Sequence, residues 1–288
     1  MFVGANSFGD IKQYFKEKLQ DRFSANELKS ILRDLTVNRF KISDLDYLTF
    51  DGNLSESDLL YYHFALKRLL KNEPIQYILG ETEFFGLRFD VEPGVLIPRP
   101  ETEELVAWVS GSHKNESGTI VDICSGSGCI AISLAKSMPG FNVVGLEISD
   151  EALEIAAKNN DKLSGNVDFR KFDALGTANY KDLKGTDVWV SNPPYIPFSD
   201  SHVMAENVLD YEPHVALFVE DNDPLIFYRI ITENAKLNLK AGGWVYFEIH
   251  EDNAYGVKDL FTQNGFVNIE VRKDLQNKPR MVRGQKVL

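Results

Sequence analysis

The chain of 288 residues contains only two cysteines, Cys124 and Cys129, and five histidines. The cysteines match no zinc or disulfide pattern, so we expect both to be buried as small apolar side chains. The histidines lack the spacing of metal ligands, and no metal site is expected. The N-terminus lacks a basic segment followed by an apolar core. We therefore expect a cytoplasmic protein with neither an export signal nor a membrane span.

Positive charge is also scarce, because 31 lysines and arginines stand against 43 aspartates and glutamates, which gives a net charge of −12. This balance argues against a partner that is bound chiefly through phosphates, so no direct nucleic-acid binding is expected. It does not exclude a basic protein partner, or nucleic acid met inside a larger complex. With 43% hydrophobic residues, the chain can bury a full core and has room for a main domain and a smaller one.

A glycine-rich turn is present between a predicted strand and a predicted helix. Residues 119–124 form an apolar run with strand character, followed by Ser125-Gly126-Ser127-Gly128 and a helical pattern over 129–135. Such a turn lets a ligand approach the backbone, and helix N-terminal amides favour anionic groups. No Lys-Ser/Thr pair follows, which excludes a P-loop for nucleoside triphosphates. Residues 141–148 predict the next strand, which places Glu147 where an acid binds ribose hydroxyls in nucleoside-binding units. A solvated carboxylate at the strand end is the alternative.

A second motif, Asn192-Pro193-Pro194-Tyr195, follows a predicted buried strand at 187–190. Asn192 and Pro193 each precede a proline and are therefore held extended. The Asn192 side-chain oxygen and the Pro193 carbonyl can accept both N–H bonds of a planar –NH2 group, while Tyr195 covers its flat face. Proline pairs also end strands in ordinary loops, and this alternative stays open. Ligands bind at the carboxyl ends of strands in open α/β sheets, which favours a binding role.

In this order the two motifs resemble those of the class I S-adenosylmethionine-dependent methyltransferases, and more narrowly the HemK/PrmC-type protein-(glutamine-N5) methyltransferases. The resemblance covers nearly the whole chain, through segments at 74–80, 83–86, 94–103, 211–213, 216–217, 247–249 and 274–284. It implies S-adenosyl-L-methionine as the cofactor and peptide-chain release factors as the partners. The implied reaction is methylation of the glutamine in the Gly-Gly-Gln loop of a release factor. We also expect a monomer.

The resemblance also assigns the site residues. It places the cofactor against Cys124, Ser125, Gly126, Ser127, Gly128, Glu147, Asp173, Ala174 and Asn192, with Asp173 near the adenine amine. It places the substrate against Asn192, Pro193, Pro194, Tyr195, Arg99 and Glu101. From the residues alone, Asp173 is nearly as well explained as an ordinary loop aspartate. Arg99 can orient a carboxylate, and Glu101 and Thr102 can reach the methionine end of the cofactor, although a surface linker is the alternative for this segment.

Three positions depart from the family pattern. Cys124 stands where the glycine loop usually begins with Gly, which is tolerable if the backbone there does not need a positive φ. Ala174 stands where a larger side chain often flanks the adenine. His250 follows Glu248-Ile249 in place of the usual Gly. The first and second departures affect details of cofactor contact, and the third concerns a strand end.

The predicted architecture has three parts. Apolar residues at helical spacing predict a small helical bundle over residues 1–73, with Ser24 and Ser55 as helix starts. By family resemblance, its outer face is expected to dock the substrate. The alternation of Leu87, Phe89 and Val91 with charged residues predicts a half-buried hairpin within a linker over residues 74–98.

Residues 99–288 predict the methyltransferase domain, an α/β fold in which strands and helices alternate around a doubly wound, Rossmann-like sheet. The sheet is expected to be mostly parallel. A helix over 224–239 is closed by Gly242-Gly243, and a strand follows at 244–249. By family resemblance, a final hairpin over 266–271 and 280–287 carries one antiparallel strand.

Two further functions remain open at this point. An N6-adenine methyltransferase acting on DNA or RNA could use the same loop, since a flipped base can stack on Tyr195. The acidic balance and the lack of a basic recognition segment argue against it. A catalytically silent cofactor-binding module is the second alternative, and it predicts that Asn192 is dispensable.

Overall fold

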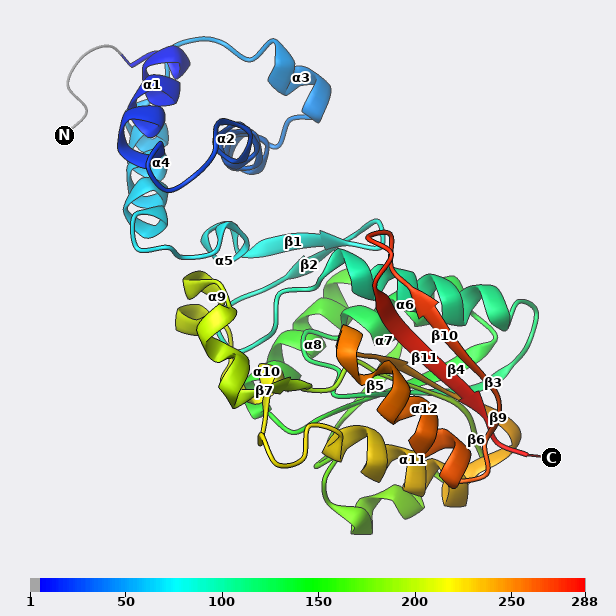
Figure 1. Cartoon of the computed structure of the whole chain (residues 1–288). Helices are drawn as coiled ribbons and strands as arrows, with labels where there is room; N and C mark the ends of the chain where they lie inside the picture. The colour runs from blue at the N-terminus through cyan, green and yellow to red at the C-terminus, as the bar shows by residue number, and fades with distance from the viewer. Residues whose placement is uncertain (1–5, 288) are drawn as a thin grey trace. The chain divides into compact units, whose positions relative to one another are not determined.

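The computed structural model describes residues 6–287, apart from the side chains of residues 177–179. The chain separates into two compact units, Met1–Gly80 and Glu81–Leu288 (Figure 1). The division falls after Gly80, so the segment that begins at Pro74 lies in the first unit as far as Gly80. No helix in the described part of the chain is long and apolar enough to cross a membrane.

The described residues of the first unit form five helices: α1 (Phe8–Leu19), α2 (Ala25–Phe40), α3 (Asp44–Leu48), α4 (Glu56–Leu69) and α5 (Ile75–Leu79). Serines start four of them through capping boxes, in which the serine hydroxyl accepts a backbone N–H and an acid three residues later accepts the serine N–H. The starts predicted at Ser24 and Ser55 are therefore confirmed. The apolar stripes of α1, α2 and α4 pack together around Phe15, Leu35 and Tyr62. The short helices α3 and α5 were not predicted.

The second unit is organised around a sheet with strand order β10-β11-β9-β6-β3-β4-β5 in the described residues. Its strands are β3 (Gly118–Ile123), β4 (Phe141–Glu147), β5 (Val167–Lys171), β6 (Thr186–Ser191), β9 (Leu239–Glu248), β10 (Val267–Lys273) and β11 (Pro279–Gln285). Strand β11 runs antiparallel to both of its neighbours, and the pairs from β9 to β5 are parallel. This confirms the predicted doubly wound sheet and its antiparallel strand.

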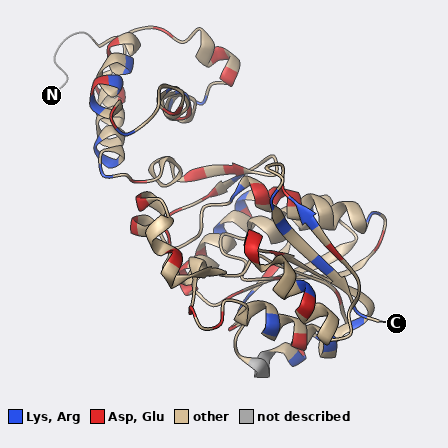
Figure 2. Cartoon of the chain, in the orientation of Figure 1, with Lys and Arg blue, Asp and Glu red and all other residues tan. Residues whose placement is uncertain are grey.

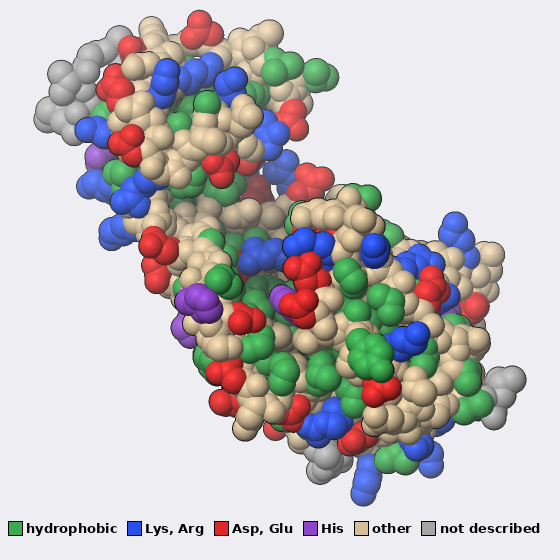
Figure 3. Space-filling model, viewed as in Figure 1, with side chains coloured by type: hydrophobic (Ala, Val, Ile, Leu, Met, Phe, Trp, Pro, Cys, Tyr) green, Lys and Arg blue, Asp and Glu red, His purple; other side chains and the backbone are tan. Residues whose placement is uncertain are grey.

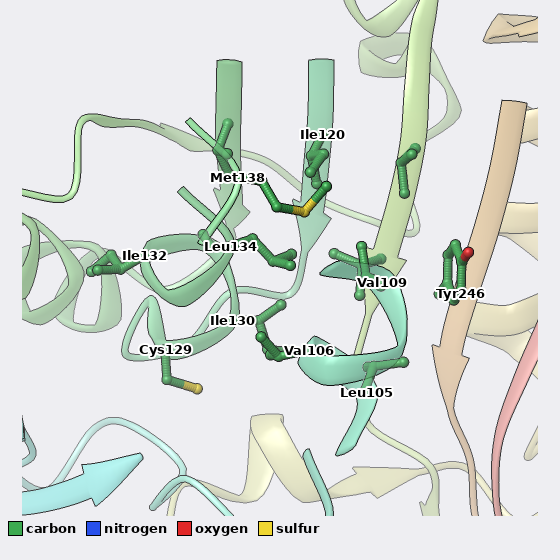
Figure 4. Packing of buried hydrophobic residues seen from close by; sticks show 14 of the residues in the cluster. Leu105, Val106, Val109, Ile120, Cys129, Ile130, Ile132, Leu134, Met138 and Tyr246 are labelled. Carbon is green, nitrogen blue, oxygen red and sulfur yellow. The ribbon is translucent and has the colours of Figure 1, made fainter. Parts of the chain in front are cut away.

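Helices cover both faces of this sheet, which explains why the central strands are apolar on both sides (Figure 1). Helices α6 (Pro100–Ser112) and α7 (Cys129–Ser137) pack on one face, and α11 (Ile226–Asn238), α12 (Ala254–Gln263) and the 3₁₀ helix η1 (Thr177–Leu183) on the other. In Figure 4, Ile130 and Leu134 of α7 lie among Val106 and Val109 of α6 and Ile120 of β3. Helix α8 (Asp150–Leu163) follows β4.

Strand β9 begins five residues earlier than predicted, at Leu239, and α11 ends at Asn238. The prediction that Gly242-Gly243 closes the helix was wrong. Leu239 is buried and extended, and Gly242 and Gly243 exchange backbone hydrogen bonds with Lys286 at the end of the chain. Pairing with the C-terminal segment therefore outweighs the usual role of glycine as a helix stop. Helix α12 was also not predicted.

The predicted hairpin is present as β1 (Glu81–Phe84) and β2 (Leu87–Asp90), joined by Phe85 and Gly86. Both turn residues have positive φ, 50° and 72°, as a tight two-residue hairpin turn requires. The remaining short elements surround the loop after β6. They are β7 (Ile196–Pro197), η2 (Phe198–Val203), α9 (Glu206–Tyr211), α10 (His214–Leu217), β8 (Phe218–Val219) and η3 (Glu251–Asn253), which follows β9.

Candidate functional site

A cavity lies at the carboxyl ends of β3, β4 and β6, the position at which open α/β sheets bind ligands. Its space of about 1040 Å³, including open solvent at the mouth, is enough for a nucleoside carrying an amino-acid chain. The wall contains nearly all residues predicted for the cofactor: Cys124, Ser125, Gly126, Ser127, Glu147, Asp173, Ala174 and Asn192. Gly128 is not part of this wall.

The two glycines of the turn after β3 do different things. A Cβ added at Gly126 would meet no atom within 4 Å, and Gly126 lines the cavity, so this position leaves room for a ligand. A Cβ added at Gly128 would lie 2.7 Å from Cζ of Phe169. Gly128 is therefore needed for close packing of the turn on β5, while Gly126 keeps the backbone accessible.

The backbone at Cys124 has a φ of 64°, in the left-handed region. The condition under which a residue other than glycine would carry no cost here, a backbone without positive φ, is therefore not met. A side chain in this region costs about 1–2 kcal/mol, which explains why glycine suits the position. Burial, followed by the nearby carboxylates of Glu147 and Asp122, raises the pKa of the Cys124 thiol. The thiol stays protonated and is a poor nucleophile.

Glu147, at the end of β4, has its carboxylate fixed by backbone N–H groups. One oxygen, Oε2, accepts from Gly126 over 2.9 Å, and the other accepts from Ile148 over 2.8 Å and from Ser149 over 3.0 Å. A carboxylate offers about four acceptor positions, so a position on this carboxylate remains for a ligand hydroxyl. The side chain is 9% exposed. Glu147 is therefore a preorganised acceptor at the cavity wall.

Two buried polar residues that the sequence did not single out hold the turn in place. Asn159 of α8 accepts from the Asp90 N–H over 2.7 Å and donates to the carbonyls of Asp90 and Ser127 over 3.0 Å each. Asp122 of β3 accepts from the backbone N–H of Ala131 over 3.2 Å at the start of α7. Its other oxygen has no hydrogen-bond partner among the described residues. Burial raises the pKa of Asp122 to about 7.

The Asn-Pro-Pro-Tyr loop joins residues from two other parts of the fold, α6 and β9. The Asn192 side-chain N–H donates to Oγ1 of Thr102 over 3.3 Å, and the Thr102 hydroxyl donates to Oε2 of Glu248 over 2.6 Å. The Tyr195 hydroxyl donates to the other oxygen of Glu248 over 3.3 Å. Asn192 is half-buried, whereas Thr102 and Glu248 are each 2% exposed. Burial raises the pKa of Glu248, and the hydrogen bond from Thr102 and the charge of Arg280 oppose this rise.

The other residues predicted for the substrate differ in their positions. Pro194 and Arg99 line the cavity, and a nitrogen of Arg99 lies 2.5 Å from a carboxylate oxygen of buried Glu212. The second oxygen of Glu212 accepts the backbone N–H of Ile97 over 3.0 Å. Glu101 instead lies toward the turn after β10, where it accepts from Gln276 over 3.3 Å. It is not part of the cavity wall.

The far end of the cavity, beyond β5, is mainly apolar. Phe172, Ala174, Leu175 and Phe227 line it beside Asp173. The Asp173 carboxylate accepts the backbone N–H of Leu175 over 2.9 Å, which fixes its direction. Since Ala174 is small, the flat walls available for a ring come from its neighbours.

His250 occupies the position after Ile249 and starts η3, where its ring nitrogen accepts from Asp252 over 3.4 Å. Its ring centroid lies 6.2 Å from that of Tyr195. Among residues 6–287, no group of His, Cys, Asp and Glu side chains is arranged to hold a metal ion.

Comparison with known proteins identifies the family. The family model "Methyltransferase small domain" matches residues 105–210. A release factor glutamine methyltransferase from Flavobacterium psychrophilum is 41% identical over 282 residues, covering 95% of this chain and 98% of its own. One from Bacteroides thetaiotaomicron is 41% identical, and one from Lactococcus lactis is 37% identical, with at least 92% of each chain covered. The chain belongs to the release factor glutamine methyltransferase family.

Family membership confirms the resemblance drawn from the sequence, and S-adenosyl-L-methionine as the cofactor of this methyltransferase. Solved structures agree on the fold. The hMettl16 catalytic domain has a TM-score of 0.57 at 16% identity, covering 83% of this chain and 84% of that one. A methyltransferase from Pyrococcus furiosus has a TM-score of 0.51 at 17% identity, covering 77% of this chain and 98% of that one. At these identities the likeness concerns the fold alone.

Proposed function

We propose that this protein transfers a methyl group from S-adenosyl-L-methionine to the side-chain amide nitrogen of the glutamine in the Gly-Gly-Gln motif of peptide-chain release factors. The similarity to release factor glutamine methyltransferases over nearly the whole chain carries this proposal. The loop at Asn192 supports it, because the Asn192 N–H is used by Thr102 and the side-chain oxygen is left as an acceptor.

The difficult part of the reaction is the acceptor, because the lone pair of an amide nitrogen is delocalised into its carbonyl. S-adenosylmethionine supplies the methyl group on a sulfonium, which is a good leaving group. The Asn192 oxygen and the Pro193 carbonyl accept both N–H bonds of the glutamine amide, and Tyr195 covers its face. This grip favours charge on the nitrogen in the transition state and fixes the direction of attack. The proton leaves to water after methyl transfer.

The cavity residues fit this cofactor. The open space at Gly126 would admit the amino-acid end near the start of α7, and the fixed carboxylate of Glu147 would accept from the ribose hydroxyls. Asp173 would accept from the adenine amine, and Leu175 and Phe227, which line the cavity beside it, would flank the ring. Arg99 donates to Glu212, and this ion pair stabilises the wall between the cofactor and the acceptor. Glu101 is kept as a substrate residue on family resemblance alone, since it lies beside the turn after β10 and outside the cavity wall.

Charge around the acceptor loop favours a protein over a nucleic acid. The segment between Pro194 and Tyr228 contains no lysine or arginine, and its acids are Asp200, Glu206, Asp210, Glu212, Glu220, Asp221 and Asp223. In Figure 2 this segment is coloured red and tan without blue, which shows its excess of acidic over basic residues. Val215 and Ala216 of the same segment line the cavity. A phosphate backbone would be repelled here, which disfavours the N6-adenine alternative, whereas a basic protein loop would be attracted.

The first unit offers a docking surface for the rest of the release factor. A groove between α1, α2 and α3 has an apolar floor that includes Leu28 and Leu32, and Leu45 and Leu48 at its edge are each 77% exposed. Its basic lining residues are Lys12, Lys16, Lys29 and Arg33, and the acid among the lining residues is Asp44. Figure 3 shows lysine and arginine side chains around hydrophobic ones on the visible face of this unit. The groove suits an acidic amphipathic segment of the release factor.

We further propose a monomeric enzyme, and its release factor substrate favours a cytoplasmic location. The test is incubation with methyl-labelled cofactor and either a release factor, the same factor with its Gly-Gly-Gln glutamine replaced by alanine, or DNA and RNA containing adenine. Peptide mapping should locate the label on that glutamine and nowhere in the alanine variant. Label on adenine, with none on the release factor, would overturn the assignment.

A further inference from the structure

Behind the acceptor loop, three side chains from different parts of the fold form a hydrogen-bonded chain. Glu248 ends β9, Thr102 lies in the first turns of α6, and Asn192 follows β6. We propose that Glu248 and Thr102 are positioning residues that fix the orientation of the Asn192 amide, so that its oxygen faces the substrate. This inference rests on the proposed function of the Asn192 loop.

Thr102 has a single hydroxyl proton for its two partners, Glu248 and Asn192. A threonine hydroxyl has one proton, and an ionised carboxylate can only accept. The Thr102 Oγ1 to Glu248 Oε2 distance of 2.6 Å is typical of a hydroxyl that donates to a carboxylate. The Thr102 proton is therefore committed to Glu248. What remains on Thr102 toward Asn192 is a lone pair, which can only accept.

This lone pair selects one of the two orientations of the Asn192 amide. With the –NH2 toward Thr102, the 3.3 Å contact is a hydrogen bond and the Asn192 oxygen is free for the acceptor amide. With the amide turned over, two oxygens without a proton between them would face each other. The –NH2 would then point at the –NH2 of the substrate, and the grip would be lost. Glu248 therefore determines, through Thr102, whether Asn192 acts as an acceptor.

The same carboxylate also fixes the aromatic cover of the site. The second carboxylate oxygen of Glu248 accepts from the Tyr195 hydroxyl, and the backbone carbonyl of Glu248 accepts from the Tyr228 hydroxyl over 3.1 Å. Burial of a carboxylate costs free energy that an apolar side chain would not. Glu248 is nevertheless only 2% exposed. Its role in orienting both Asn192 and Tyr195 explains why a carboxylate is buried at this position.

The experiment compares T102V, T102S, E248Q and the double variant T102V/E248Q in the full-length enzyme. Valine keeps the shape of threonine without a hydroxyl, and serine keeps the hydroxyl. In E248Q the glutamine –NH2 can donate to Thr102. The Thr102 proton is then free to point at the Asn192 oxygen. We expect T102V and E248Q each to lower kcat roughly 10- to 100-fold, as expected for a misplaced reacting group. The KM for release factor and the affinity for cofactor should stay within a few-fold, and T102S should keep most of the activity.

The double variant supplies a readout that a merely structural role would not give. Residues that act as one chain are not additive, so T102V/E248Q should be no slower than the slower single variant. Multiplicative losses in kcat, or a T102V enzyme with wild-type kcat, would overturn the positioning role. Failure of the proposed function would appear differently, because the wild-type enzyme measured alongside would then leave the release factor glutamine unmethylated.

Discussion

The carboxylate oxygen Oε2 of Glu147 lies 2.9 Å from the backbone nitrogen of Gly126 and accepts its hydrogen bond. This contact links the end of β4 to the turn after β3. The acid assigned to the ribose and the turn assigned to the amino-acid end of the cofactor therefore form one unit. A change at Glu147 should affect both.

Replacement of Glu147 by alanine should weaken S-adenosylmethionine binding by about 1–3 kcal/mol, because the ribose hydroxyls lose a charge-assisted acceptor. Glu147→Gln is the matched control, since it keeps one acceptor oxygen without the charge, and should lose less. Titration calorimetry of the full-length enzyme measures both. Wild-type affinity in the alanine variant would mean that Glu147 is a solvated carboxylate at the end of the strand and does not bind the ribose.

Position 124 should prefer glycine to alanine. Both substitutions remove the sulfur, but only alanine keeps a Cβ at the φ of 64°. We expect the Cys124→Gly variant to have a free energy of unfolding about 1 kcal/mol higher than Cys124→Ala, measured by urea denaturation. Equal stabilities would mean that the left-handed backbone at Cys124 carries no strain.

The pH dependence of stability should report on Asp122. The folded state raises the pKa of this carboxyl from 3.8 to about 7 and so binds its proton more tightly than the unfolded chain does. The stabilising contribution of the protonated form is complete below about pH 4 and is lost as the pH rises toward 7. Asp122→Asn removes the titration. Wild-type stability should therefore fall relative to Asp122→Asn between roughly pH 4 and 7, and parallel pH profiles would contradict the raised pKa.

Leu45→Ala combined with Leu48→Ala should raise the KM for intact release factor by roughly 10-fold, because two exposed apolar contacts of the groove are lost. Methylation of a short Gly-Gly-Gln peptide should be unchanged. Leu237→Ala is the control, since Leu237 is 71% exposed but lies in the second unit. Equal effects on peptide and intact protein would rule out docking in this groove.

The sequence predicted those parts of the fold that depend on local pattern. Capping serines, alternating apolar residues and the order of strands gave the helices, the hairpin and the sheet, and strand ends brought Glu147, Asp173 and Asn192 to one cavity. Contacts between distant segments could not be read from local pattern. Asn159 bonds to Asp90 and Ser127, and β9 starts at Leu239 because it pairs with the end of the chain. The same holds for the link from Glu248 through Thr102 to Asn192.

Replacement of Asn192 by alanine tests the acceptor grip most directly. The substitution removes one aimed acceptor from the transition state and leaves unchanged Glu147 and Asp173, the residues proposed for the ribose and the adenine of the cofactor. Single-turnover methylation of intact release factor should be slower by roughly 100-fold or more, with cofactor affinity within a few-fold of wild type. An Asn192→Ala enzyme with an unchanged rate of methyl transfer would contradict the role of this loop.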